Sequence, residues 1–387
     1  MKVIQLKNSI ELIETPDFTE IPNLEELVFE DCINLREIHP SIADLTKLTL
    51  LNLKGCKNLK SLPSKFEMES LEILILSHCS KVKKIPEFGV NMKRVRKLYL
   101  DGTAITKVPA SIENLTSLAS LKLKYCKNLV CLPSIILNLK LLKDVDISGC
   151  SKVERLLENL RNVESVEELD VSGTAIRHMP SSIGHLKNLK RLSFKGCKGL
   201  SSSNKSWYEL IPFYSKPISP DPVGLSPLLD LCSLTDLNLS DCNLKAIPND
   251  IGSLFTLESL YLDGNKFVCL PESICQLSNL KWTSMNNCTS LRSLSKLPSN
   301  IKAIGATNCI SLEMLPDLLK PNDSCEPHLN LQNCFKLADN QCLTSVFFSA
   351  IKKQLQVSLF SLFSLSLTLS SKYHTLYVSG TLSSISI

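Results

Sequence analysis

Aliphatic side chains recur along this chain in one short pattern, interleaved with polar residues. Residues 48–63, LTLLNLKGCKNLKSLP, carry leucines at the spacing Leu-x-x-Leu-x-Leu, followed three residues later by Cys56. Leu51 and Leu53 are two apart, so in an extended strand both point to one face and Asn52 points to the other. One such unit cannot bury its apolar face alone, so the pattern predicts a stack of similar units.

The pattern returns at a nearly constant period. From Met1 to Leu189 its first apolar position falls every 23 or 24 residues, and after a longer gap the array resumes at Leu234. We therefore predict an α/β repeat fold: a leucine-rich-repeat solenoid, or horseshoe, with a parallel sheet on its concave side and short helical or irregular turns on its convex side. The successive starts are Met1, Leu24, Leu48, Leu71, Val95, Leu118, Leu142, Val166, Leu189, Leu234, Leu257, Leu280 and Ile301.

The units come in two lengths. In the longer form three residue steps lead from the cysteine to the next apolar residue, as from Cys126 to Leu129, and the shorter form has one step fewer. In the shorter form we expect Gly102, Gly173 and Gly264 to supply the tight turn that leaves the strand. After the next proline, a serine precedes two apolar residues three apart, which predicts a short helical turn with a serine cap on the convex side.

Changes in composition divide the chain into five segments. We expect leucine-rich repeats over 1–200, a Pro/Ser-rich insertion over 201–230 and further repeats over 231–320. Residues 321–353 are expected to start a truncated jelly-roll or Ig-like domain, and 354–387 form a low-complexity Ser/Leu tail. The insertion holds five prolines, which cannot continue a strand ladder. Its two interpretations are a bulged loop or decayed repeat, and a binding protrusion built on its aromatic residues.

Charge and cysteine usage narrow the class of protein. The 387 residues carry a formal net charge of +5 with both signs interspersed, so we expect neither nucleic acid nor an anionic membrane as partner. No apolar stretch is typical of a signal peptide or a membrane span. Ten of the 16 cysteines share one repeat position, where we expect small buried groups with weak donors. These structural cysteines are Cys32, Cys56, Cys79, Cys126, Cys150, Cys197, Cys242, Cys288, Cys309 and Cys334.

The sequence offers no pattern typical of catalysis. It has no Cys-x-x-Cys pair, no phosphate-binding Gly-rich loop, no nucleophile elbow and no zinc-protease helix, so we expect no enzyme activity, no metal and no cofactor. Acid pairs such as Glu167 and Glu168 fall at variable strand positions, where solvated charge is the expected state. Thiols that stay reduced favour an intracellular location, in the cytoplasm or the nucleus.

The variable strand positions are the candidate binding surface, because they face away from the leucine core. Acidic and basic residues alternate there on adjacent turns, and aromatic residues occur near both ends; such residues anchor and orient protein interfaces. The opposing interpretation is a set of solvated variable positions without a partner. The candidates on the concave face are Tyr99, Asp101, Lys122, Lys124, Asp146, Asp170, Lys195, Tyr261, Asp263 and Trp282, with Asn286 beside them.

Several phrases of this sequence resemble the repeats of a known family. LNLKGCKNLKSLP, LYLDGTAITKVPASIENL, ISGCSKVERL, VSGTAIRHMPSSIGHLKNL and FKGCKGL look like leucine-rich repeats of TIR-type nucleotide-binding disease resistance proteins, plant immune receptors similar to the tobacco mosaic virus resistance class. The resemblance covers roughly residues 1–320. It implies a module for the defence response that recognises pathogen effectors or guarded host proteins and restrains a nucleotide-binding domain.

The resemblance leaves other functions open. The sequence contains neither a TIR nor a nucleotide-binding domain, so NAD cleavage and nucleotide binding are not implied, and a decayed or decoy receptor fragment is the first alternative. An extracellular repeat-type receptor or inhibitor is the second, permitted by the sequons at Asn114 and Asn204 but opposed by the missing signal peptide and the thiol pattern. A substrate adaptor for protein degradation would need a helical segment before the repeats, which the sequence lacks.

Overall fold

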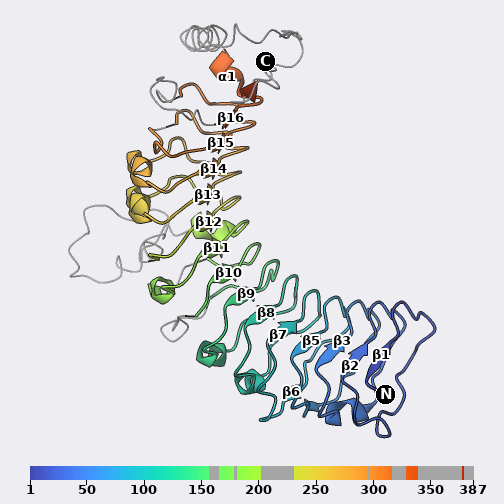
Figure 1. The fold of residues 1–387 in the computed structure, drawn as a ribbon. Coiled ribbons are helices and arrows are strands. Elements are labelled where there is room, and N and C mark those ends of the chain that lie inside the picture. Colours follow the sequence, from blue (N-terminus) through green and yellow to red (C-terminus); the bar gives the residue numbers. More distant parts are fainter. Residues whose placement is uncertain are drawn as a thin grey trace, which may run out of the picture. The chain divides into compact units, whose positions relative to one another are not determined.

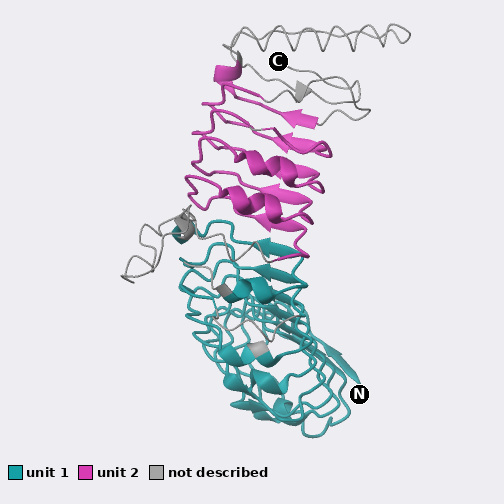
Figure 2. Cartoon of the chain, turned by 90° about the vertical axis from the view of Figure 1, so that its left-hand side faces the viewer, with its two compact units in different colours: residues 1–199 teal, residues 200–387 magenta. Residues whose placement is uncertain are grey.

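The structure, a computed structural model, describes residues 1–156, 165–177, 181–201, 231–294, 296–315, 328–338 and 377–378. The chain forms two compact units, Met1–Gly199 and Leu200–Ile387 (Figure 2). The Pro/Ser-rich insertion predicted for 201–230 lies outside the described residues except for Ser201. The Ser/Leu tail predicted for 354–387 also lies outside them, apart from residues 377 and 378.

Unit 1 is built on a ladder of parallel three-residue strands, one from each turn (Figure 1). The register is constant, so that Leu51 faces Leu27 on one side and Leu74 on the other. The parallel solenoid predicted from the repeat period is therefore confirmed. The strands are β1 (Val3–Gln5), β2 (Glu26–Val28), β3 (Leu50–Asn52), β5 (Ile73–Ile75), β7 (Lys97–Tyr99), β8 (Ser120–Lys122), β9 (Asp144–Asp146), β10 (Glu168–Asp170) and β11 (Arg191–Ser193).

Unit 2 repeats the same arrangement. Its strands β12 (Asp236–Asn238), β13 (Ser259–Tyr261), β14 (Trp282–Ser284), β15 (Ala303–Gly305) and β16 (His328–Asn330) are parallel, and β17 (Tyr377–Val378) joins β16 antiparallel. In β16, Leu329 pairs with Ile304 in the register of the earlier turns, and the short helix α1 (Phe335–Ala338) follows. Residues 328–330 thus form one more repeat strand, while the domain boundary at 320 stays a prediction.

Opposite the strands, several turns contain a 3₁₀-helix, and two further turns pair through β4 (Lys65–Phe66) and β6 (Glu87–Phe88) (Figure 1). The 3₁₀-helices are η1 (Pro40–Asp44), η2 (Ala110–Asn114), η3 (Ser134–Asn138), η5 (Ser181–His185), η6 (Lys198–Ser201), η9 (Asn249–Ser253) and η10 (Glu272–Gln276). The predicted serine caps are wrong. In η2, η3, η9 and η10 the N-cap residue is a proline, which has no side-chain acceptor, and His39 caps η1. Ser111 instead accepts a hydrogen bond from Phe88 N of the preceding turn at 2.9 Å.

The core is a continuous aliphatic stack inside each unit. Leu51, Leu53 and Leu59 of one turn are fully buried, and the first apolar positions from Leu24 onward are buried as well, whereas Met1 is 75% exposed. Burying one leucine stabilises the fold by roughly 1.5–3 kcal/mol before entropy is counted. A polar substitution at Leu51 would remove contacts with both neighbouring turns, because each turn packs only against the next.

A residue with left-handed backbone conformation follows each strand from β1 to β16 except β4 and β6. Gly102, Gly173 and Gly264 have φ of +65°, +64° and +65°, which confirms the tight turns predicted for them. The longer units use the same conformation, which the sequence did not reveal because most of their residues at this position carry side chains. Apart from glycines, the equivalent positions include Asn8, Asp31, His78, Tyr125, Asp241, Asn287, Asn308 and Asn333.

Candidate protein-interaction surface

The outward side of the strands forms what we call the sheet face: the strand positions that alternate with the buried leucines. Four of the predicted residues make one row across β7, β8, β9 and β10, because Tyr99 pairs in register with Lys122, Lys122 with Asp146, and Asp146 with Asp170. Adjacent members of such a row are about 4.8 Å apart along the sheet. Beyond β10 the row continues on β11 with Ser193, which pairs with Asp170. Lys195 follows β11, so it does not belong to this row.

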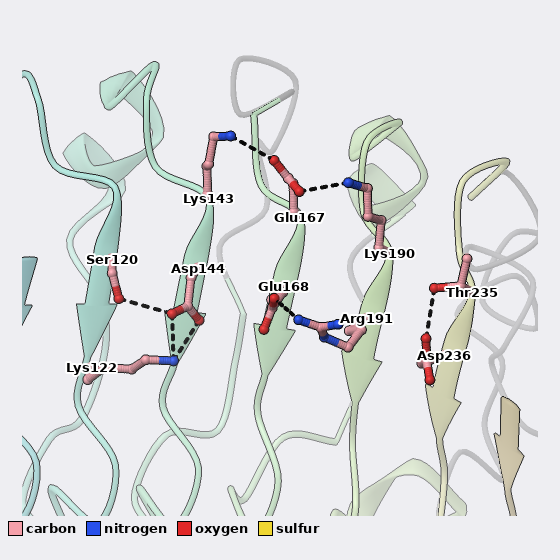
Figure 3. A network of polar contacts seen from close by, with 10 residues as sticks. All are labelled: Ser120, Lys122, Lys143, Asp144, Glu167, Glu168, Lys190, Arg191, Thr235 and Asp236. Carbon is pink, nitrogen blue, oxygen red and sulfur yellow. Dashed lines mark hydrogen bonds and ion pairs between the residues drawn. The ribbon is translucent and has the colours of Figure 1, made fainter. Parts of the chain in front are cut away.

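An ion pair couples β8 to β9. The ammonium of Lys122 lies 2.6 Å from Asp144 Oδ2, which also accepts a hydrogen bond from Ser120 Oγ at 2.9 Å (Figure 3). Burial lowers the pKa of Lys122, but the hydrogen bond and charge of Asp144, with the charges of Asp146 and Glu168, outweigh burial and leave that pKa raised. Lys122 is therefore a fixed positive charge on the sheet face.

A second charge cluster crosses β9 to β11 at the residues that enter the strands. Glu167 lies between Lys190 and Lys143, at 2.8 Å and 3.0 Å from their ammonium groups (Figure 3). These two hydrogen bonds, the one from Lys190 first, lower the pKa of Glu167 to about 2. Next to them Arg191 pairs with Glu168. Opposite charges thus alternate from turn to turn.

Most of this cluster was not anticipated from the sequence. Asp144, Lys190 and Arg191 were not among the candidates, and Glu167 and Glu168 were both expected to be solvated charges. The acid pair at 167 and 168 was the available signal. Its partners are 23 or more residues away in the sequence and become neighbours only when the turns stack, so single-unit patterns could not reveal the pairing.

The predicted aspartates also serve the backbone. Asp146 Oδ1 accepts a hydrogen bond from Ser148 N, and Asp170 Oδ1 accepts one from Ser172 N, both at 2.8 Å. Asp101 accepts from Lys124 N of the following turn at 2.9 Å. These carboxylates fix the turns that leave the strands, so their replacement would alter the fold as well as the surface.

In unit 2 the predicted residues form an aromatic patch. Trp282 is 43% exposed and Tyr261 37% exposed, on neighbouring strands but in different rows, since Trp282 pairs with Ser259. The ammonium groups of Lys281 and Lys302 lie 5.9 Å and 5.8 Å from the Trp282 ring. Both are within the range of a cation–π interaction.

Two predicted polar residues of unit 2 are tied to the backbone of the turns. Asp263 accepts from Ser240 Oγ at 3.3 Å and from Asn286 N at 2.7 Å. Asn286 Oδ1 in turn accepts from Thr307 N at 2.8 Å. Asp263 and Asn286 therefore support the turns beside the aromatic patch rather than presenting free groups.

The structural cysteines are all buried and free. Most donate a hydrogen bond to a carbonyl oxygen of the preceding turn; for Cys56 the acceptor is Phe29 at 3.1 Å, and for Cys150 it is Leu123 at 3.1 Å. The predicted buried, weakly donating thiols are confirmed. Burial raises the pKa of Cys197, and it raises the pKa of Cys288 to about 12, so these thiols stay protonated. In shorter units other hydrogen-bonding residues take the position: Thr103, Thr174 and Asn265.

No group of three or more His, Cys, Asp or Glu side chains could hold a metal ion within the described ranges. Across the same ranges, the helices are all too short or too polar to cross a bilayer. The arrangement of the sheet face thus consists of paired charges and partly exposed aromatic rings on a rigid strand ladder. Such a surface suits recognition of another protein.

The stacked strands and thiols define a leucine-rich-repeat protein, and the comparisons agree. Residues 233–254 and 256–277 match the general leucine-rich-repeat family. A leucine-rich-repeat protein from Leptospira interrogans has a similar fold, with a TM-score of 0.57, 23% identity, and coverage of 79% of this chain and 71% of that one. The functional domain of InlJ from Listeria monocytogenes, described as including a cysteine ladder, gives a TM-score of 0.52 at 15% identity, covering 87% and 66%.

Sequence relatives narrow the class. Residues 67–171 match the family described as disease resistance protein RPS4B-like, leucine-rich repeats. TMV resistance protein N from Nicotiana glutinosa is 37% identical over 306 residues, 79% of this chain and 25% of that protein. Disease resistance-like protein DSC1 from Arabidopsis thaliana is 37% identical over 219 residues, 56% and 16%. The chain is a leucine-rich-repeat array similar to the repeat regions of plant disease resistance proteins, and it spans a quarter or less of the length of these two relatives.

Proposed function

We propose that this chain is a protein-recognition module in plant defence, whose sheet face binds a pathogen effector or a guarded host protein. The sheet face or its edges also bind the nucleotide-binding domain of a receptor and restrain that domain until the effector or host protein is bound. The family supports the link to defence, since the relatives are disease resistance proteins. The repeat fold indicates a binding module rather than a catalytic one. We propose the cytoplasm, and the nucleus, as its location.

The observation that carries this proposal is the row of Tyr99, Lys122, Asp146 and Asp170 on four adjacent strands. Strands of a stacked ladder hold side chains at fixed separations, so a partner meets a preorganised pattern of charge. Alternating charge favours one orientation of the partner and excludes others. The partly exposed Tyr261 and Trp282 offer the kind of anchors that contribute most binding energy at interfaces.

Co-immunoprecipitation from plant cells tests both parts of the proposal. The tagged full chain is expressed together with the nucleotide-binding domain of a TIR-type receptor, with and without extracts of infected tissue. We expect the domain to be captured from healthy tissue and released when an effector or its host target is captured. Recovery of chaperones alone would contradict the proposal and favour a decayed or decoy receptor fragment.

Variants of the sheet face separate recognition from folding. Lys122→Gln with Lys124→Gln removes two charges, keeps a side-chain donor beside Asp144 and leaves the backbone acceptors in place, and we expect it to abolish capture. Asp146→Asn with Asp170→Asn keeps a side-chain oxygen for Ser148 N and Ser172 N, so the turns persist while the negative charges are lost. Unchanged capture by both double variants would remove the sheet face as the binding site.

A further inference from the structure

A second surface of unit 1 carries charge of one sign only. On the segment of each turn that runs from the structural cysteine position to the next proline, four consecutive turns contain lysines and no acidic residue: 57–63, 80–86, 103–109 and 126–133. All of these lysines are exposed. We call this surface the lysine flank; its members are Lys57, Lys60, Lys81, Lys83, Lys84, Lys107 and Lys127.

The four turns lie side by side, so the lysines form one patch. Ser80 Oγ donates to Lys57 O at 3.4 Å, Ala104 N donates to Val82 O at 2.9 Å, and Val130 N donates to Thr106 O at 3.3 Å. Each bond joins one turn to the next along the flank. The chain's modest net charge of +5 therefore conceals a local concentration of positive charge.

The lysine flank differs from the sheet face in its lack of counter-charges. By contrast, Lys122 on the sheet face has a carboxylate partner, and so do Lys143 and Lys190, which precede β9 and β11. Within the described part of the chain, no ammonium group of the lysine flank forms an ion pair; Lys81 donates to the neutral Asn58 Oδ1 at 2.6 Å. Like charges held together without partners repel one another, and an anionic ligand would relieve that repulsion.

A notch opens at the edge of this patch. Its volume is about 550 Å³, and it is lined by Ser80 of one turn, residues 102–104 of the next, and Tyr125, Lys127 and Asn128 of the third. The middle turn is a shorter unit, with one residue fewer than the units on either side of it. The recess at this turn has a lysine, an amide and a 52% exposed aromatic ring on its wall.

The shape and composition of the site favour a peptide over other anions. A recess one turn wide can take a protruding side chain, whereas a flat bilayer surface could contact only its rim. The exposed ring of Tyr125 offers an apolar contact in the recess, which a phosphate backbone would not use. Lysine also lacks the planar fork with which arginine grips phosphate in two places.

We propose that the lysine flank and its notch bind an acidic peptide segment of a partner protein. Carboxylates of the segment lie along the lysines, and one apolar or aromatic side chain enters the notch against Tyr125. Four turns span roughly 15 Å, which is the length of about five extended residues. This site adjoins the sheet face at Lys124, whose ammonium group lies 5.2 Å from the centre of the Tyr125 ring. Its own lysines lie at other positions of the turns, so variants of Lys83, Lys84 and Lys107 test it separately from the sheet face.

The test uses the full chain and a fluorescent peptide of about eight residues with alternating glutamates and a central phenylalanine. Fluorescence anisotropy should show binding that weakens with added salt, because exposed charges are screened. A peptide with glutamine in place of glutamate should not bind. Lys83→Glu with Lys84→Glu and Lys107→Glu should weaken binding at least about tenfold. Ala104→Phe, which fills the notch, should weaken it while leaving the lysines unchanged.

The matched control reverses three exposed charges elsewhere in unit 1, Lys93, Arg94 and Lys140, each to glutamate. It changes the net charge equally and should leave peptide affinity within about twofold. Circular dichroism confirms that each variant is folded. Equal losses in the control and the flank variant would overturn the proposal, since non-specific charge would then explain binding. Binding of oligodeoxythymidine or phosphatidylserine vesicles in place of the peptide would also overturn it.

Discussion

The ring of Tyr125 lies against the backbone of Gly149 on the next turn, so closely that a Cβ added at Gly149 would overlap Tyr125 Cδ1. Both residues have positive φ, 57° for Tyr125 and 74° for Gly149. A bulky residue in this region is uncommon, and here the absence of a neighbouring side chain makes room for its ring. This contact places the tyrosine on the wall of the notch.

Gly149→Ala is expected to destabilise unit 1 through two effects. An alanine at positive φ costs roughly 1–2 kcal/mol, and the overlap with Tyr125 adds about 1–3 kcal/mol. Gly173→Ala is the matched control, because φ is +64° there but an added Cβ would meet only Gly149 backbone atoms, at 3.6 Å. Thermal unfolding should show a larger loss for Gly149→Ala, and Tyr125→Ala should cancel the difference. If the two glycine variants lose the same stability, whether or not Tyr125 is replaced, the contact between Tyr125 and Gly149 is contradicted.

The structural cysteines are expected to stabilise the stack through their hydrogen bonds. Cys56→Ala removes the donor to Phe29 O and leaves a small cavity, which together should lower the free energy of unfolding by about 1–3 kcal/mol. Cys56→Thr should cost less, because Thr103 fills the same position of its own turn and donates to Leu100 O at 2.8 Å. Denaturant unfolding under reducing conditions measures the stability of both variants. If Cys56→Ala is as stable as the native chain, the thiol does not stabilise the stack.

Thiol reactivity should divide the cysteines by position. Cys131, Cys232, Cys269 and Cys275 are exposed, whereas the structural cysteines are buried. Because burial raises the pKa of Cys288 to about 12, its thiolate is scarce at neutral pH and becomes abundant only as pH approaches that value. Iodoacetamide labelling followed by mass spectrometry should modify the exposed group at least about a hundredfold faster. Rapid labelling of the structural cysteines near neutral pH would contradict their burial between the stacked turns.

The Lys143–Glu167–Lys190 cluster should make stability depend on pH. The folded-state pKa of Glu167 is lowered to about 2, so its contribution is present above the unfolded value near 4.3 and is lost as pH falls toward 2. The difference in melting temperature between native chain and Glu167→Gln should therefore shrink over that interval. Added salt should also reduce it, because the groups are exposed. If this difference in melting temperature stays constant from neutral to acid pH, the effect of Glu167→Gln comes from packing and not from charge.

The candidate binding residues illustrate how far reasoning from the sequence could reach. The alternation of Leu51, Asn52 and Leu53 placed each side chain on the correct face of its strand, so the row through Tyr99 and Lys122 could be anticipated. The bonds from Asp146 and Asp170 to the turns could not, because they depend on backbone orientation after the strand. The proline N-caps also escaped it, since the serine pattern fits a cap equally well.

By itself, the sequence determined the period of the array, the parallel strand ladder and the burial of the cysteines, because each turn repeats the same local pattern and needs neighbours to bury its leucines. Only the tertiary structure decided which charges meet, as Glu167 meets Lys143 and Lys190, and where Tyr125 rests against Gly149. It also showed that one short turn among longer ones has a notch beside unpaired lysines. These features arise between residues about one turn apart in sequence, where stacking geometry sets the contacts and no single repeat contains both partners.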